Sequence, residues 1–166
     1  WFNIGEQSSA TVNLNEDGTA TVITGSPDIG GSRASMALMA AEELGIDVHR
    51  ITPVVADTES VGFTDVTEGS RATFATGMAV VNACRELIDE LKARAATILG
   101  VEADAVDWVD GAAVAEDKDP LPLADITAKA KSTTTSACNN ARVPETISVP
   151  NKTENRFMGA NSSLSK

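Results

Sequence analysis

The sequence predicts an α+β fold in which a small mixed sheet, made of two hairpins and a crossover strand, carries one short and one long helix. Three observations support this prediction. Two pairs of β-prone runs are each divided by turn formers, one β-branched run lies between the pairs, and two stretches repeat apolar residues at helical spacing. A chain of 166 residues with 42% hydrophobic residues is long enough to bury a core.

The first half of the chain predicts a hairpin, a helix and a strand. Turn formers at residues 16–18 separate two β-prone runs, which is typical of a hairpin. Good helix formers begin at Ser32, and Gly45 supplies a stop, so a helix lies between them. The β-branched run that follows is a crossover strand beside the hairpin. The predicted bounds are 10–15 and 19–24 for the hairpin, 32–44 for the helix and 50–56 for the strand.

The second half begins with a long amphipathic helix, predicted over residues 73–99 and ended by Gly100. The apolar stripe that is expected to face the sheet contains Phe74, Met78, Val81, Cys84, Ile88, Leu91, Ala95 and Ile98. Because Cys84 lies on this stripe, it is interpreted as a small buried hydrophobe rather than a reactive thiol. A second hairpin is predicted at residues 106–109 and 112–115, and a short helix at 122–130.

The amino-acid composition of the chain changes after Lys131. Residues 1–131 are predicted to form the folded domain, and residues 132–166 form a Ser/Thr/Asn-rich tail that is loop-like or partly disordered. The chain opens on Trp1 and Phe2 rather than on Met, and two large apolar residues in that position would ordinarily be covered. We therefore expect a segment of a longer polypeptide.

The charge and the cysteine content exclude several classes of function. A formal net charge of −11 argues against binding to nucleic acid or to an anionic membrane, because both require a basic surface. The two cysteines lack metal-ligand spacing and indicate neither a zinc site nor a disulfide framework. No stretch has the length of a membrane span, and the N-terminal residues lack the features of a secretory signal. A cytoplasmic location is expected.

Two Gly-Ser-Arg triplets stand where the two main helices are predicted to begin. The first lies in TGSPDIGGSR, residues 24–33 (the first GSR segment), and the second in TEGSRAT, residues 67–73 (the second GSR segment). Glycine lets a ligand approach the main chain, and a helix start offers unpaired N–H groups and a positive dipole end. The two segments could therefore converge on one polyanionic ligand. Asp57 and Thr58 follow a predicted strand and either line the same cleft or cap a simple turn.

In the alternative interpretation, neither triplet binds a ligand. Each serine then caps its helix, and each arginine pairs with a neighbouring carboxylate. Neither segment matches GxGxxG or a P-loop, so the patterns of the nucleotide-binding folds do not apply.

Three ordered stretches of the chain match a known family. They are SSATVNLNEDGTATVITG, GSPDIGGSRASMALMAAEELGI and VVADTESVGFTDVTEGSRATFATGMAVVNAC, and the match covers about residues 1–130. These stretches resemble the molybdopterin-binding subunit of the xanthine dehydrogenase/aldehyde oxidase family of molybdenum hydroxylases. The resemblance implies a molybdopterin-binding-domain-like fold within an oxidoreductase that hydroxylates an aldehyde or heteroaromatic substrate with oxygen from water.

The resemblance also implies cofactors, partners and contacts. The cofactor is molybdopterin, alone or as its cytosine dinucleotide, and iron-sulfur and FAD groups lie on partner subunits or domains. The partners are the rest of the molybdopterin subunit and the iron-sulfur and flavin subunits. In the family, the loop matching the first GSR segment approaches the pterin and the metal, and the loop matching the second contacts the pterin and its phosphate. The implied cofactor-binding residues are Ile29, Gly30, Gly31, Ser32 and Arg33, with Gly69, Ser70, Arg71, Ala72 and Thr73.

The chain departs from the family pattern in two respects. Many members carry glutamine where this chain has Gly31, and the Gly-Gly-Ser-Arg form is that of a branch of the family. The family's catalytic glutamate lies downstream of the matched region, so no catalytic residue is assigned in this chain. The segment is therefore expected to supply one wall of the cofactor site and to be inactive by itself. The rival hypothesis is a truncated, cofactor-free scaffold or interaction domain.

Overall fold

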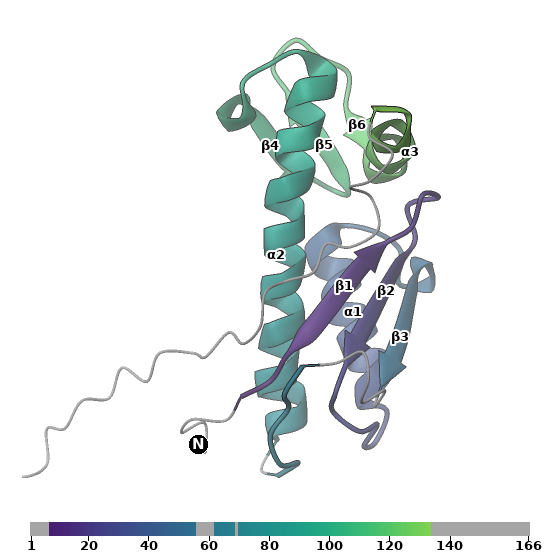
Figure 1. Ribbon diagram of the computed structural model, residues 1–166, viewed down its shortest axis with the longest axis vertical. Coiled ribbons are helices and arrows are strands. Elements are labelled where there is room, and N and C mark those ends of the chain that lie inside the picture. Colours follow the sequence, from purple (N-terminus) through teal and green to yellow (C-terminus); the bar gives the residue numbers. More distant parts are fainter. Residues whose placement is uncertain (1–6, 56–61, 69, 134–166) are drawn as a thin grey trace, which may run out of the picture.

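A computed structural model describes residues 7–55, 62–68 and 70–133 and confirms the α+β class (Figure 1). These residues contain three helices and six short strands. The elements are β1 (Ala10–Leu14), β2 (Ala20–Thr24), α1 (Ser32–Leu44), β3 (Ile51–Val55), α2 (Arg71–Leu99), β4 (Val106–Val109), β5 (Ala112–Ala115), β6 (Leu121–Pro122) and α3 (Leu123–Thr133). Two 3₁₀ turns, Val48–Arg50 and Ala103–Ala105, lead into β3 and β4.

The first sheet has the strand order β1-β2-β3 and contains the predicted hairpin and crossover strand. β1 and β2 are antiparallel, and β3 runs parallel to β2 after the crossover through α1. At the hairpin turn, the Asp17 carboxylate accepts hydrogen bonds from the Thr19 backbone N–H and hydroxyl. These bonds, the backbone one first, lower the pKa of Asp17. Helix α1 packs against β3 and α2 against β1, which leaves the opposite face of the sheet toward the viewer in Figure 1.

The expectation of one sheet is wrong, because the second hairpin belongs to a separate sheet of order β4-β5-β6. The hairpin gains a third strand when Leu121 pairs with Ala113 and Pro122 with Ala112. Pro122 is tolerated because the two-residue strand β6 lies at the edge of the sheet. The second sheet lies at the upper end of α2 in Figure 1, so the long helix joins two sheets instead of covering one.

Helix α2 follows its predicted bounds closely but buries a different face in its first half. Phe74 is 61% exposed and Met78 is also exposed, whereas Val80 is fully buried. Val81 and Ile88 are only half-buried, so the predicted stripe holds at Cys84, Leu91 and Ala95. The physical reason is close packing on α1, where small residues of α2 permit contact. A Cβ at Gly77 would lie 2.6 Å from the sulfur of Met39.

Several predictions concern residues outside the described part of the chain. They are the burial of Trp1 and Phe2, the roles of Asp57, Thr58 and Gly69, and the character of the tail, of which α3 includes residues 132 and 133. Within the described residues, no helix combines the length and the apolar character needed to cross a membrane.

Candidate functional site

Both GSR segments lie at the same end of the molecule, the lower end in Figure 1. The first connects the end of β2 to the start of α1, and the second leads into α2. A hydrogen bond of 2.7 Å between the hydroxyls of Ser26 and Thr76 joins the first segment to the second turn of α2. The fold therefore brings together the two segments that the sequence singled out, through residues that the sequence did not.

The glycines of the first GSR segment form an open, left-handed turn. Gly30 and Gly31 have φ angles of 60° and 82°, which lie in the left-handed region that favours glycine. Both are exposed, and a Cβ built on either would meet no atom within 4 Å. Among the described residues, their backbone N–H groups donate no hydrogen bond. The turn can therefore admit a flat group against the main chain and offer it two donors.

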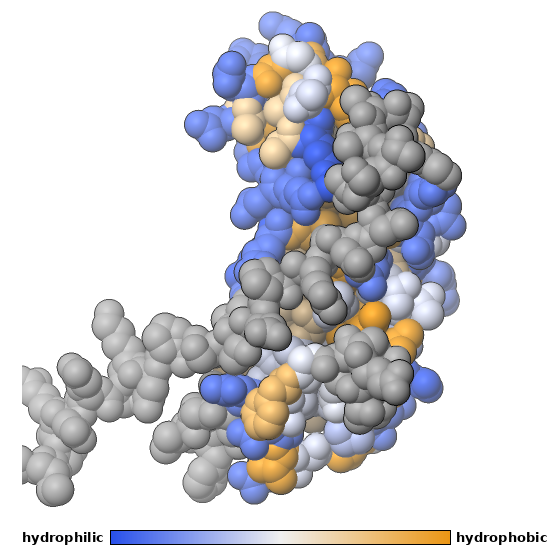
Figure 2. Space-filling view, viewed as in Figure 1, coloured by the Kyte–Doolittle hydropathy of each residue, from blue (hydrophilic) through white to orange (hydrophobic). Residues whose placement is uncertain are grey.

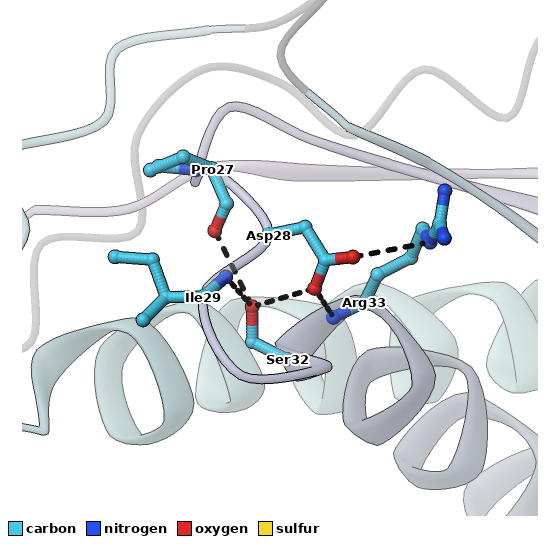
Figure 3. Close-up of polar contacts among 5 residues, drawn as sticks. All are labelled: Pro27, Asp28, Ile29, Ser32 and Arg33. Carbon is cyan, nitrogen blue, oxygen red and sulfur yellow. Dashed lines mark hydrogen bonds and ion pairs between the residues drawn. The ribbon is translucent and has the colours of Figure 1, made fainter.

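At the start of α1, the Asp28 carboxylate already pairs with the Arg33 side chain and with a backbone N–H group of the helix (Figure 3). Asp28 accepts a hydrogen bond of 3.1 Å from the Arg33 backbone N–H, and its other oxygen lies 3.5 Å from Arg33 Nε. The Ser32 hydroxyl is not the N-cap, because Gly31 occupies that position. Instead it accepts from the Ile29 N–H at 3.1 Å and donates to the Pro27 carbonyl at 3.3 Å. For Arg33, the alternative of pairing with a neighbouring carboxylate is the one observed.

At the start of α2, unlike that of α1, neither the N-cap side chain nor a carboxylate of a described residue accepts a hydrogen bond from the backbone N–H groups. Ser70 is the N-cap, has φ 71° and makes no side-chain capping bond. The N–H groups of Ala72 and Thr73 donate to no described residue, whereas those of Arg71 and Phe74 bond to Glu68 and Ser70. Ser70 and Thr73 are exposed. At the second GSR segment, the described residues therefore leave the Ala72 and Thr73 donors and the positive end of the helix dipole for an anion.

Arg71 has a buried position that the sequence did not predict. The side chain is 1% exposed and donates from Nη2 to the Gln7 carbonyl and, at 2.8 Å, to the Ser8 hydroxyl. Nε and Nη1 are buried without a hydrogen-bond partner, and no described carboxylate pairs with this guanidinium. In this conformation the two arginines of the repeated triplet have different environments, one paired at the surface and one buried.

Sequence reasoning missed four residues of this region, which are Ser8, Ser26, Asp28 and Thr76. Asp28 carried a usable signal, because an Asp shortly before a helix commonly accepts from its first N–H groups. The three hydroxyl residues carried none, because serines such as Ser8 and Ser26 are ordinary in loops beside strands, and a threonine such as Thr76 within a helix usually has no distant partner. Among the described residues, no group of three or more His, Cys, Asp or Glu side chains could hold a metal ion.

The sequence of the chain matches a known family and a known protein. A family model described as the molybdopterin cofactor-binding domain matches residues 1–160. A xanthine dehydrogenase of Emericella nidulans is 32% identical over 87 residues, which are 52% of this chain and 6% of that protein.

Solved structures share the fold at low identity. The Cu,Mo-CO dehydrogenase in its carbon monoxide reduced state superimposes with a TM-score of 0.74 at 20% identity, over 83% of this chain and 18% of that chain. Quinoline 2-oxidoreductase from Pseudomonas putida 86 gives a TM-score of 0.65 at 19% identity, over 81% of this chain and 18% of its own. Reconstituted CO dehydrogenase from Oligotropha carboxidovorans gives 0.73 at 19% identity, over 83% and 18%.

The chain thus spans a small part of each relative, between 6% and 18% of its length. Because the family model covers nearly all of the sequence, the match includes both GSR segments and both sheets. The resemblance predicted from the sequence is confirmed, and the chain belongs to the molybdopterin cofactor-binding domain family.

Proposed function

We propose that this chain supplies one wall of the molybdopterin site in a molybdenum hydroxylase. The observation that carries the proposal is the pairing, at one end of the molecule, of an open glycine turn with an uncapped helix start. When bound, molybdopterin supplies the molybdenum chemistry that hydroxylates an aldehyde or heteroaromatic carbon with oxygen from water. The part proposed for this chain is to bind and orient the cofactor.

The two segments suit different parts of the cofactor. Gly30 and Gly31 leave room beside the main chain and offer N–H donors, which fits a flat pterin ring with acceptor atoms. Asp28 would repel a phosphate at the start of α1, because its carboxylate already lies there. No carboxylate of a described residue accepts a hydrogen bond from the N–H groups of Ala72 and Thr73. We therefore assign the ring to the first GSR segment and the phosphate to the second.

Further cofactors and partners belong to the same proposal. Iron-sulfur and flavin groups on partner subunits would accept the electrons, and molybdopterin would be present alone or as its cytosine dinucleotide. The rest of the molybdopterin subunit would cover the apolar side chains that are exposed near the start of α2. These are Phe63, Val66, Phe74 and Met78. Figure 2 shows apolar atoms on this face at the end where both GSR segments lie.

The rival hypothesis, a cofactor-free scaffold, has less support. The two exposed glycines of the first GSR segment leave open space beside the main chain, which a bound ring would use. The family match also favours cofactor binding.

The test compares two glycine substitutions in the complete protein that carries this chain, purified from a host that makes molybdopterin. Gly31→Asn places a side chain in the proposed ring site, and Asn tolerates the left-handed backbone. Gly100→Asn is the matched control, since Gly100 has φ 70° and the same open space but ends α2. Wild type and Gly100→Asn are expected to contain molybdenum and pterin, and Gly31→Asn to lose most of both.

Metal analysis and pterin fluorescence give the result. A wild-type protein without pterin contradicts cofactor binding. A fully loaded Gly31→Asn variant would show that the first GSR segment is only a turn.

A further inference from the structure

A continuous chain of buried hydrogen bonds joins the two GSR segments. Arg71 Nη2 donates to Ser8 Oγ at 2.8 Å, Ser8 Oγ lies 2.9 Å from Thr76 Oγ1, and Thr76 Oγ1 lies 2.7 Å from Ser26 Oγ. The exposed fractions are 1% for Arg71, 5% for Ser8, 0% for Thr76 and 4% for Ser26. Solvent therefore does not compete for these bonds.

The ends of this hydrogen-bond chain lie in the two candidate segments. Ser26 comes directly before the turn that contains Gly30 and Gly31. Arg71 directly follows Ser70, the N-cap of α2, in the second GSR segment. Thr76 lies between the two ends and is separated by 50 residues from Ser26 and by 68 from Ser8. The connection is therefore made by tertiary structure and not by local sequence.

The guanidinium gives the hydrogen-bond chain a direction. A buried cation repels the positive ends of nearby hydroxyl dipoles, so their protons point away from it. Ser8 accepts from Arg71, and this repulsion favours donation from Ser8 to Thr76 and from Thr76 to Ser26, although the two distances by themselves fit either direction. In either direction, Thr76 Oγ1 bonds to two hydroxyls at once, which a serine hydroxyl can also do and a valine side chain cannot. Chains of this kind strengthen each member cooperatively.

We propose that Thr76 is a positioning residue, which couples the two GSR segments and holds the walls of the proposed cofactor site at a common spacing. The coupling itself needs only the hydrogen-bond chain. Its consequence for a cofactor rests on the proposed function. The proposal accounts for a threonine hydroxyl that has no exposure and yet bonds to two other elements.

Amide hydrogen exchange of the 166-residue chain tests the coupling without any cofactor. Thr76→Val is expected to accelerate exchange about tenfold at the hydrogen-bonded amides of the first GSR segment and of the start of α2, and to leave the β4–β5 hairpin unchanged. These amides are those of Ile29, Ser32 and Arg33, and those of Arg71 and Phe74. Thr76→Ser should restore both segments to within about twofold of wild type, because it keeps the hydroxyl. Thr97→Val is the matched control, since the Thr97 hydroxyl bonds only locally, to the Ala93 carbonyl at 3.2 Å in the same helix.

The two ends can be cut separately. Ser26→Ala is expected to accelerate amide exchange in the first GSR segment alone. Arg71, Ser8 and Thr76 remain bonded to one another in this variant. Ser8→Ala is expected to accelerate amide exchange at the start of α2 alone. If Thr76→Val does not fold, these two variants test the coupling in its place. Unchanged exchange in both segments, or equal acceleration over the whole chain, overturns the coupling.

Pterin content separates this inference from the proposed function. In the complete protein, loss of pterin from Thr76→Val with retention in Thr76→Ser supports the positioning role. Equal pterin content in Thr76→Val and wild type overturns that role. Absence of pterin from wild type contradicts the proposed function alone, because the exchange experiment requires no cofactor.

Discussion

At the scale of single residues, the repeated Gly-Ser-Arg triplet performs different tasks at its two occurrences. Arg33 is an exposed partner of Asp28, and exposed ion pairs of this kind contribute about 0–1 kcal/mol. Arg71 is buried among hydroxyl and carbonyl oxygens, where removing a charged donor leaves its partners unsatisfied. The surroundings of a residue, and not the motif, therefore determine what it contributes.

Cys84 gives a prediction about pH. Burial, with a smaller contribution from Glu43, raises the pKa of the Cys84 thiol from 9.0 to about 12. The thiol ionises above pH 9 in the unfolded chain but stays neutral in the folded protein up to about pH 12. The stability it contributes is fully present below pH 9 and is expected to be lost progressively between pH 9 and about 12.

Urea unfolding of wild type and Cys84→Ala in buffers on both sides of pH 9 measures this effect. Cys84→Ala is expected to lower the free energy of unfolding at neutral pH. Above pH 9, that free energy should fall less steeply in Cys84→Ala than in wild type. Parallel curves for the two proteins across this range would contradict the prediction.

At the scale of elements, a close backbone contact joins α1 to the second sheet. The C-cap Gly45 has φ 71°, and a Cβ there would lie 2.8 Å from the Asp110 carbonyl carbon and closer still to the Gly111 nitrogen. The Trp108 indole donates at 3.1 Å to the Leu44 carbonyl, an otherwise unpaired group at the helix end. The end of one helix therefore serves as a docking point for a hairpin about sixty residues away.

This contact predicts unequal costs for two helix-ending glycines. Gly45→Ala is expected to lower the free energy of unfolding by about 3–4 kcal/mol, because backbone strain and overlap add. Gly100→Ala should cost only about 1–2 kcal/mol, since its φ is 70° but its Cβ would meet nothing within 4 Å. Thermal and urea unfolding compare the two, and equal losses would show that the contact with Gly111 is unimportant.

Because α2 buries a different face from the predicted one, substitutions at two adjacent valines should change the stability by different amounts. Val80 has 0% exposure and Val81 is half-buried. Val80→Asp is expected to cost about 3–5 kcal/mol by burying an unpaired carboxylate, and Val81→Asp clearly less. Circular dichroism during urea unfolding checks both variants. A larger loss for Val81→Asp would restore the face predicted from the sequence.

At the scale of the whole molecule, α2 is the element that joins two small sheets. Its 29 residues span about 43 Å at 1.5 Å per residue, and it contacts β1 near one end and β4, β5 and α3 near the other. Both GSR segments lie at one end, so the second sheet supports them from a distance, through α2 and through its contact with the C-terminal end of α1. The chain spans 18% of the length of the solved structures that share its fold.

The whole-molecule prediction concerns activity. The 166-residue chain, supplied with cofactor, is expected to hydroxylate neither an aldehyde nor a purine, because a partial site cannot hold the reacting geometry. An assay with an artificial electron acceptor measures turnover, and the complete protein is the positive control. Turnover that depends on the isolated chain alone would contradict the prediction.

The sequence by itself determined the local structure and the family. The hairpin turns, the start of α1 at Ser32 and the ends at Gly45 and Gly100 agree with the prediction, because turn chemistry and helix stops act over a few residues. The ordered match through both GSR segments was likewise readable, and the family model confirms it.

Only the tertiary structure decided which surfaces meet. The second sheet, the rotation of α2, the pairing of Arg33 with Asp28 and the burial of Arg71 all depend on packing between distant segments. Helical spacing identifies an apolar stripe. The face that is buried can nevertheless be a different one, because small residues such as Gly77 permit closer contact with α1. Hydroxyls such as Thr76 acquire a role only when the fold supplies partners fifty or more residues away.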